Sequence, residues 1–340
     1  MLHFDTDYMR GCHPDILRRL TETNLDQTPG YGTDLFTAQA RELIKKACDA
    51  PEARVFFLVG GTQTNATVID AVLNHHEGVV CVETGHINVH EAGAVEATGH
   101  KVLTLPAHDG KMDPRELKEY IENFYSDETF EHMVAPGMVY ISFPTELGTI
   151  YSLRELEELS NMCREFSIPL FLDGARLGYG LAASGEVTLK DIARLCDVFY
   201  IGGTKVGAMF GEAVVVTDPK LFRHPVPTIK QHGALLAKGR LLGIQFETLF
   251  TDDMYLRISR NAVDRAMEMK KGFIEKKYRL FIDSPTNQQF FVLPNEVIDM
   301  LREKVSFELW GPRGEKETPV RFVTDWGTRQ EDVRELISLL

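Results

Sequence analysis

Residues 169–178 read PLFLDGARLG, and this stretch decides how the rest of the chain is interpreted. A short apolar run ends in Asp173, and Arg176 follows after two small residues. A run this apolar is typical of a strand that is buried on both faces of a parallel sheet. An ionised carboxylate at its end needs a cationic or hydrogen-bonding partner. An Asp173–Arg176 pair that only ties a loop is one alternative, and a functional pair is the other.

The chain on either side of this stretch alternates apolar strand-like runs with amphipathic runs of helical length. The predicted strands are 53–60, 79–84, 101–105, 138–143, 170–173, 198–203 and 212–216, and the predicted helices are 62–75, 87–98 (stopped by Gly99), 153–166 and 188–195. This alternation predicts a mostly parallel α/β sheet of βα units that is covered by helices on both faces.

Ligands of such sheets bind at the carboxyl ends of the strands, so the residues at these ends are the candidates for a site. The clusters predicted to lie there are 60–62, 83–86, 144–146, 173–176 and 202–205.

The pattern changes near residue 235. A long helical region is followed by three short strand-like runs at 288–294, 307–311 and 320–326, which surround the helical run 295–304. We therefore expect residues 1–235 to form an N-terminal segment and a large domain that carries these strand ends, and residues 236–340 to form a small C-terminal α+β domain.

Composition excludes several classes of protein. The net charge of -13 disfavours nucleic acid or an anionic membrane as the main partner. The N-terminus has no apolar signal region, and the five cysteines have no C-x-x-C spacing. We expect a cytoplasmic protein with reduced thiols. His86 and His90 could share a helix face, but no third metal ligand is evident, so we expect no metal and favour an imidazole that stacks on a flat ligand.

Lys205 lies in the glycine-flanked turn 202–207, GGTKVG, at the end of the strand that follows Asp173 along the chain. An enclosed lysine with a lowered pKa is a nucleophile that can form a Schiff base. The stretch 60–65, GGTQTN, places glycines and N–H groups at a helix start, which suits a phosphate. A phosphate cradle, a stacking ring at His86, the strand-end Asp173 and Lys205 are together the parts needed to hold pyridoxal 5'-phosphate.

Several motifs in this order resemble the threonine aldolase branch of the β-eliminating lyases, which are pyridoxal-phosphate enzymes. They are YGTD (31–34), GGTQTNA (60–66), GHINVHEAG (85–93), DGARL (173–177), CDVFYIGGTK (196–205) and VRFVT (320–324). The resemblance implies an aspartate-aminotransferase-like fold of type I, with a large, mostly parallel sheet of the seven-stranded type and a small C-terminal α+β domain.

The resemblance also implies roles for individual residues. Lys205 would form the Schiff base, Asp173 would pair with the pyridine nitrogen, and His86 would stack on the ring. Arg321 would bind the substrate carboxylate. The other residues implied at the site are Gly61, Thr62 and Thr204 for the cofactor, Arg176 for cofactor or substrate, Thr6 for substrate, and Tyr31 and Arg240, which would lie near the cofactor of a neighbouring subunit. The resemblance thus implies a homo-oligomer, a dimer or tetramer with shared sites.

Residues 142–150, SFPTELGTI, depart from the family pattern, because Glu146 stands where many threonine aldolases carry a histidine. A carboxylate can also accept the proton of a β-hydroxyl group. We therefore predict retro-aldol cleavage of L-threonine or L-allo-threonine to glycine and an aldehyde. Another pyridoxal-phosphate β-elimination, a transamination on a small amino acid and, more remotely, a non-catalytic protein that retains the fold are the alternatives.

Overall fold

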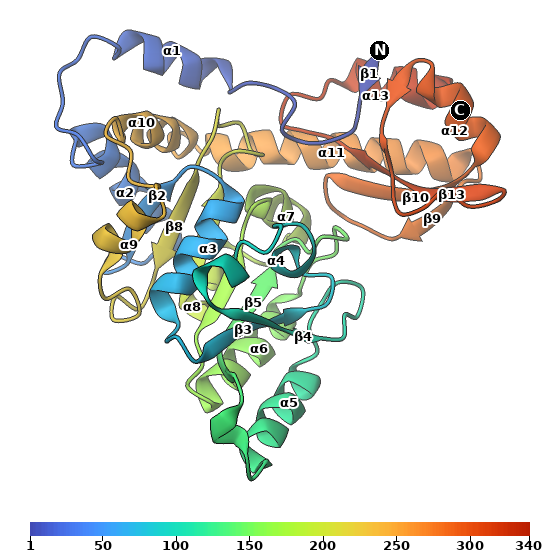
Figure 1. Ribbon diagram of the computed structural model, residues 1–340. Coiled ribbons are helices and arrows are strands. Elements are labelled where there is room, and N and C mark those ends of the chain that lie inside the picture. Colours follow the sequence, from blue (N-terminus) through green and yellow to red (C-terminus); the bar gives the residue numbers. More distant parts are fainter.

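The largest sheet has seven strands in the order β2-β8-β7-β6-β5-β3-β4 in the computed structural model, which describes residues 1–340 (Figure 1). The strands are β2 (Arg54–Leu58), β3 (Glu77–Val82), β4 (Lys101–Leu105), β5 (Ala135–Ser142), β6 (Leu170–Asp173), β7 (Val198–Gly202) and β8 (Glu212–Val216). Strands β4, β3, β5, β6 and β7 run parallel to one another, whereas β8 is antiparallel to β7 and β2. The predicted mostly parallel sheet is confirmed.

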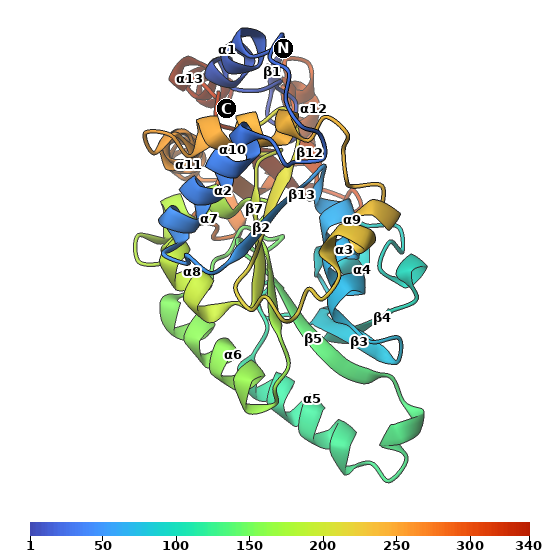
Figure 2. The same cartoon turned by 90° about the vertical axis from the view of Figure 1, so that its left-hand side faces the viewer.

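Helices cover both faces of this sheet (Figure 2). One face carries α2 (Leu35–Cys48), α5 (Pro114–Ser126), α6 (Leu153–Glu165), α7 (Leu177–Ser184) and α8 (Leu189–Leu195). The other face carries α3 (Gly61–Val72), α4 (His86–Val89) and α9 (Pro225–Gln231). None of the helices combines the length and the apolar character that crossing a membrane requires.

Strand β6 shows why the sheet needs helices on both sides. All four of its residues are buried, with Leu170 and Leu172 in one hydrophobic cluster and Phe171 in the other. Because successive side chains of a strand point to opposite faces, the continuous apolar run fills both cores at once. Asp173, the last residue of the strand, shares the face of Phe171.

Local sequence signals set the start of α6. The Ser152 side chain accepts a hydrogen bond from the Glu155 N–H, and the Glu155 carboxylate accepts one from the Ser152 N–H. This capping box satisfies two N–H groups at the helix start. Helix α3 differs, because its N-cap is Gly60 and no side chain caps it.

The predicted helix over 87–98 is wrong. Helix α4 ends at Val89, and only the short 3₁₀ turn η1 (Glu96–Thr98) follows. Ala92 and Gly93 have φ angles of 52° and 73°, which an α-helix does not allow. The buried Glu91 carboxylate binds back to His86, so the chain turns there.

A second sheet of four strands, in the order β12-β13-β10-β9, lies towards the C-terminus. Its strands are β9 (Arg279–Ile282), β10 (Gln288–Pro294), β12 (Glu308–Leu309) and β13 (Glu317–Val323), and helices α12 (Asn295–Arg302) and α13 (Gln330–Ser338) accompany them. At the N-terminus, β1 (Leu2–His3) pairs in parallel with β11 (Val305–Ser306) in a separate two-stranded sheet, so the start of the chain lies with the C-terminal elements.

The long helix α11 (Met254–Glu275) joins the two sheets (Figure 1). Tyr255 and Ile258, near its start, belong to the larger core, whereas Met269 and Phe273 belong to the core of the small sheet. The remaining elements are α1 (Pro14–Glu22), α10 (Arg240–Leu249) and the 3₁₀ turn η2 (Phe130–His132). A division into domains after residue 235 stays a prediction.

The turns after β6 and β7 touch each other directly. A Cβ atom on Gly174 would lie 1.8 Å from the Tyr200 carbonyl oxygen, and one on Gly202 would lie 2.3 Å from the Ala175 carbonyl oxygen. These glycines allow two strand ends, and with them Asp173 and Lys205, to lie side by side.

We predict that Gly174→Ala lowers the free energy of unfolding by about 3 kcal/mol, because the added methyl group has no room. Urea denaturation followed by circular dichroism measures this change. The matched control is Gly11→Ala, where no atom lies within 4 Å of the new Cβ. Equal midpoints for the two variants would contradict the close contact of the turns.

Candidate active site

Two adjoining cavities open at the carboxyl ends of the parallel strands. Their volumes are about 40 Å³ and about 330 Å³. Both are lined by His86, Glu146, Arg176 and Lys205, so they form one continuous site. The smaller cavity adds Gly61, Glu91, Ser142, Pro144, Thr145, Asp173, Ala175 and Tyr200, and the larger adds Tyr8, His90, Glu308, Trp310 and Arg321.

Asp173 is 5% exposed and accepts hydrogen bonds on both carboxylate oxygens. Oδ1 accepts from the Tyr200 hydroxyl at 2.6 Å and the Ala175 N–H at 2.9 Å, and Oδ2 accepts from the Tyr140 hydroxyl at 2.6 Å and Asn65 Nδ2 at 3.0 Å. Burial alone raises the pKa of Asp173, but these hydrogen bonds outweigh it and hold the pKa below its ordinary value. The carboxylate is therefore ionised.

Lys205 reaches into both cavities, and no side chain or carbonyl group of the protein binds its amino group. Burial and the nearby Arg176 hold the pKa of Lys205 below its ordinary value. Its own backbone is fixed, because the Tyr179 hydroxyl donates to the Lys205 carbonyl oxygen. A free amine of lowered pKa in an enclosed site is the form in which lysine acts as a nucleophile.

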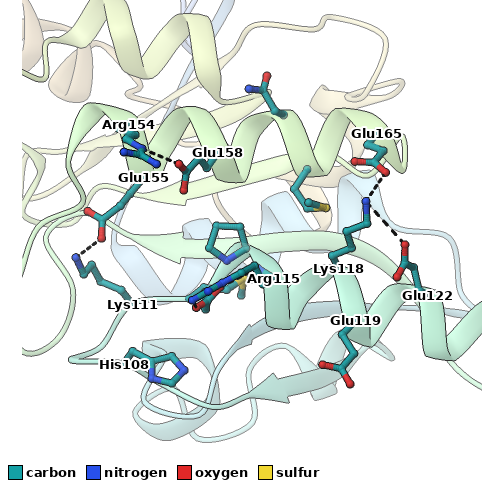
Figure 3. A pocket seen from close by; sticks show the side chains of 15 residues that line it. His108, Lys111, Arg115, Lys118, Glu119, Glu122, Arg154, Glu155, Glu158 and Glu165 are labelled. Carbon is teal, nitrogen blue, oxygen red and sulfur yellow. Dashed lines mark hydrogen bonds and ion pairs between the residues drawn. The ribbon is translucent and has the colours of Figure 1, made fainter.

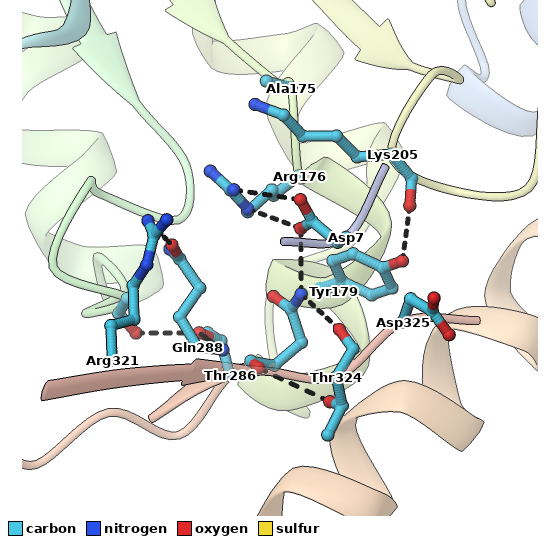
Figure 4. A network of polar contacts seen from close by, with 12 residues as sticks. Asp7, Ala175, Arg176, Tyr179, Lys205, Thr286, Gln288, Arg321, Thr324 and Asp325 are labelled. Carbon is cyan, nitrogen blue, oxygen red and sulfur yellow. Dashed lines mark hydrogen bonds and ion pairs between the residues drawn. The ribbon is translucent and has the colours of Figure 1, made fainter. Parts of the chain in front are cut away.

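Arg176 pairs with Asp7 of the N-terminal segment and not with Asp173. Its Nε and Nη2 atoms lie 2.6 and 3.0 Å from the Asp7 carboxylate, which also accepts from Asn287 Nδ2 at 3.0 Å. Figure 4 shows this network with the Lys205 side chain close by. Asp7 neutralises Arg176 and leaves Arg176 Nη1 without a partner inside the protein.

His86 is oriented by a carboxylate. Its Nδ1 lies 2.7 Å from Glu91 Oε1, and because a carboxylate only accepts, Nδ1–H donates. Asn65 Nδ2 donates to the same oxygen at 2.8 Å, which links His86 to Asp173 through one amide group. The structure has no group of three or more His, Cys, Asp or Glu side chains placed to hold a metal ion.

The start of α3 lies at the floor of the smaller cavity. Gly61 lines the cavity and Thr62 is the next, exposed residue of the first helical turn. The N–H groups of this turn have no partner within the helix, and no side chain caps them. Such a terminus binds anions.

Thr204 does not direct its hydroxyl hydrogen into the cavity. The hydroxyl donates to Glu212 Oε1 at 2.7 Å and accepts from the Gly211 N–H at 2.9 Å. Glu212 also accepts from the Gly203 N–H, and burial raises the pKa of its carboxyl to about 7. Glu212 therefore holds the turn that carries Lys205.

Arg321 comes from β13 and enters the larger cavity from the small sheet. Glu308 binds its Nη2 and Gln288 Oε1 accepts from its Nη1 at 3.0 Å, while the guanidinium lies 5.1 Å from the centre of the Trp310 ring. Burial and Arg176 hold the pKa of Arg321 below its ordinary value, which still leaves it a cation.

Glu146 stands at the junction of the two cavities. Its Oε1 accepts from the Ser142 hydroxyl at 2.6 Å and from the His86 N–H at 3.0 Å, and Oε2 has no partner in the protein. Burial raises the pKa of Glu146 above its ordinary value. The side chain therefore binds a proton more readily than an exposed carboxylate does.

Five of the predicted site residues line neither cavity, and they are Thr6, Tyr31, Thr62, Thr204 and Arg240. Thr6 immediately precedes Asp7 but lines neither cavity. Tyr31, which is 50% exposed, and Arg240 line two other surface hollows. Arg240 binds the Asp26 and Thr23 carbonyl oxygens.

Sequence reasoning missed Asp7, Asn65, Tyr140 and Tyr200. The two tyrosines did leave a signal, because each interrupts a buried apolar strand, in MVYISF (138–143) and VFYIGG (198–203). A buried phenol needs a hydrogen-bond partner, which points to a polar group nearby. Asp7 gave no signal, because its partner is distant in sequence.

A wider hollow, of about 840 Å³, is an open groove between α5 and α6 (Figure 3), and it shares no lining residue with the two Lys205 cavities. Ion pairs join most of its charged groups, among them Lys118 with Glu165 and Arg154 with Glu158. Because these charges already neutralise one another, we place the site in the smaller cavities at the strand ends.

The sequence profile of the β-eliminating lyases matches residues 4–290. The chain belongs to the β-eliminating lyase family. This lyase is also 40% identical to a threonine aldolase from Leishmania major, whose structure superimposes with a TM-score of 0.96 over 100% of this chain and 98% of that chain. A low specificity L-threonine aldolase from Pseudomonas sp. (strain NCIMB 10558) is 29% identical over 342 residues, which cover 98% of this chain and 95% of the relative.

More distant structures establish the type of fold. An aspartate aminotransferase double mutant from Thermus thermophilus matches with a TM-score of 0.72 over 100% of this chain and 90% of that chain, at 13% identity. The predicted aspartate-aminotransferase-like fold of type I is therefore confirmed for this lyase.

The residues of this lyase fit pyridoxal 5'-phosphate. The site offers an amine without a partner at Lys205, a buried anion at Asp173, an imidazole at His86 and an uncapped helix start at Gly61. These groups match the aldehyde, the pyridine nitrogen, the ring face and the phosphate of that cofactor in chemical type.

The Asp7–Arg176 pair predicts a pH-dependent contribution to stability. The pKa of Asp7 is lowered, because Arg176 and Lys205 outweigh the effect of burial. The stabilisation is thus present above the ordinary carboxyl pKa and is lost as pH falls through the lowered one. We predict that Asp7→Asn costs about 3 kcal/mol at pH 7, because it leaves Arg176 buried without a counterion.

Urea denaturation of the cofactor-free protein at pH 7 and at several values below about pH 4 tests this effect, and the difference from wild type should shrink at acidic pH. Asp299→Asn, which breaks the exposed pair with Arg313, is the control and should change stability little at any pH. A difference for Asp7→Asn that stays constant with pH would contradict the assignment.

Proposed function

We propose that this chain is a pyridoxal-phosphate-dependent aldolase. It cleaves a β-hydroxy-α-amino acid, such as L-threonine or L-allo-threonine, to glycine and an aldehyde. One observation carries the proposal: Lys205 and Asp173, from the ends of neighbouring parallel strands, line the same cavity. The 40% identity to a threonine aldolase over the whole chain supports the choice of substrate class.

The protein supplies groups for each part of the cofactor. When bound, the cofactor accepts the electron pair of the broken Cα–Cβ bond into its protonated ring. Lys205 would supply an amine for its aldehyde, Asp173 a negative charge for its ring nitrogen, and His86 a flat ring for stacking. Gly61 and Thr62, in the first turn of α3, would hold the phosphate.

The substrate is held from the small-sheet side. Arg321 binds its carboxylate, with the Nη1 atom of Arg176 and the hydroxyl of Thr6 as further donors. Glu308 and Gln288 orient the Arg321 guanidinium. A substrate carboxylate that binds Arg321 shares this guanidinium with Glu308. Fixing the carboxylate sets the direction of the Cα–Cβ bond relative to the site.

Glu146 takes the proton from the β-hydroxyl group as that bond breaks. The Ser142 hydroxyl and the His86 N–H hold its Oε1 atom, so Oε2 is left to receive the proton. Its raised pKa makes it a stronger base than an exposed carboxylate. Thr204 acts by holding the Lys205 turn through Glu212.

The active assembly is a cytoplasmic homo-oligomer, a dimer or a tetramer, with shared active sites. Tyr31 and Arg240 lie outside the Lys205 cavities of their own chain. They lie near the cofactor of a neighbouring subunit in the assembly that we propose.

Product analysis tests the proposal. Purified protein with pyridoxal phosphate should turn L-threonine into equal amounts of glycine and acetaldehyde, measured by chromatography and an alcohol dehydrogenase assay. Lys205→Ala should abolish both products and the absorbance that borohydride bleaches in wild type. Ammonia and a keto acid in place of these products would identify a β-elimination, and transfer of the amino group to an added keto acid would identify a transaminase.

We predict that Glu146→Gln lowers kcat/KM for L-threonine about 100-fold, because an amide keeps the shape but cannot take a proton. The visible spectrum with bound cofactor should stay the same. In wild type the acidic limb of the pH–rate profile should lie above the ordinary carboxyl pKa, and the variant should lose that limb. Glu83→Gln, an exposed change beyond the end of β3, is the control. Equal rates for the two variants would rule out Glu146 as the base.

A further inference from the structure

Two tyrosines stand out in the interior of the large sheet. Tyr140 in β5 and Tyr200 in β7 are 1% and 0% exposed. Both lie in one hydrophobic cluster, to which the same two strands otherwise contribute only the apolar residues Met138 and Val198. A buried phenol is costly unless its hydroxyl finds a partner. The hydroxyl of each tyrosine donates to Asp173 at 2.6 Å.

The order of the strands explains how both reach the same carboxylate. Strands β5 and β7 flank β6 on either side. Phe171, two residues before Asp173 on the same face, lies between the two phenol rings, at 5.6 Å from Tyr140 and 6.3 Å from Tyr200 between ring centres. This fully buried contact fixes both rings, so each hydroxyl approaches a different oxygen of Asp173.

Four donors of the protein bind the carboxylate of Asp173. With Asn65 Nδ2 and the Ala175 N–H, the two phenols bring the donors to four, two on each oxygen. Charge is therefore drawn away from both oxygens before any ligand binds, and the proton affinity of the group is low.

Other buried carboxyl groups near Asp173 make these hydrogen-bond donors necessary. The Asn65 amide donates to both Glu91 and Asp173, so these two carboxylates lie close together. The negative charges of Asp173 and Glu146 repel each other. Glu212, with a pKa of about 7, is a further acid near Lys205. Buried carboxylates in such a cluster take up protons unless donors or cations stabilise the anion.

We propose that Tyr140 and Tyr200 are positioning residues that keep the proton shared by Asp173 and the cofactor on the ring nitrogen, and not on the carboxylate. This inference rests on the proposed function. In a low-dielectric site an ion pair of carboxylate and pyridinium competes with the neutral pair of acid and pyridine. Two hydroxyl donors stabilise only the charged form of Asp173, so they shift the proton towards nitrogen. Removing them shifts it towards oxygen, with no change in the number of protons.

The test compares wild type with the double variant Tyr140→Phe, Tyr200→Phe, each saturated with pyridoxal phosphate labelled with ¹⁵N in the ring. The nitrogen resonance of wild type should lie at the position of a protonated pyridine and that of the double variant should move towards the unprotonated position. Tyr151→Phe is the matched control, because this buried hydroxyl accepts from the Met112 N–H and does not contact Asp173. Its resonance should equal that of wild type.

Steady-state kinetics on L-threonine provide a second measurement. We expect kcat of the double variant to fall about tenfold or more, as the loss of two hydrogen bonds to a charged group implies, while KM changes little because no substrate contact is altered. If the double variant does not fold, the single variants should each give an intermediate nitrogen shift.

The outcomes separate this inference from the proposed function. Wild-type protein that binds no labelled cofactor would defeat the proposed function itself. Wild type with a protonated nitrogen, together with unchanged nitrogen resonances in the folded double variant or in both single variants, would overturn the role of the tyrosines alone.

Discussion

The buried carboxylate of Asp173 is the interaction on which the rest of this site depends. It ends a strand whose apolar residues fill both cores of the sheet, so water cannot solvate it fully. Two phenols, an amide and a backbone N–H replace that water. The fold therefore places a permanent negative charge inside the protein at the point where the neighbouring strand delivers an amine, Lys205.

Charge balance organises the second layer of the site. Arg176 and Arg321 face the same cavity, and each has a carboxylate partner, Asp7 or Glu308. The partners come from the N-terminal segment and from the small sheet, so the site is closed by parts of the chain that lie far from the strand ends in sequence. Because each cation already has a carboxylate partner, a substrate carboxylate has to share these guanidinium groups with Asp7 and Glu308.

The N-terminal segment links the two sheets physically. Strand β1 pairs with β11 beside the small sheet, and a few residues later Asp7 contacts Arg176 at the end of β6. Asn287, the residue that precedes β10, donates a hydrogen bond to the same Asp7 carboxylate. The small sheet thus contributes to the geometry of the strand-end site as well as to the binding of substrate through Arg321.

The sequence by itself determined where the strands of the large sheet lie along the chain and that Lys205 and Asp173 follow strand ends, because continuous apolar runs ending in polar residues report strand ends directly. It also identified Glu146 as a departure from the family pattern. It did not predict the break after α4, where Ala92 and Gly93 turn the chain so that Glu91 reaches His86. The spacing of apolar residues along the sequence carries no information on the contact between Glu91 and His86.

Only the tertiary structure decided which groups hold Asp173. Arg176 was a candidate by its spacing, yet it binds Asp7, while the hydroxyls of Tyr140 and Tyr200 arrive from the strands on either side. Strand order and register bring these atoms within 2.6 Å of Asp173, although they are 33 and 27 residues away along the chain. A linear pattern reports the face and the end of a strand. It carries no information on which distant strand lies beside it, because that is settled by packing over the whole sheet.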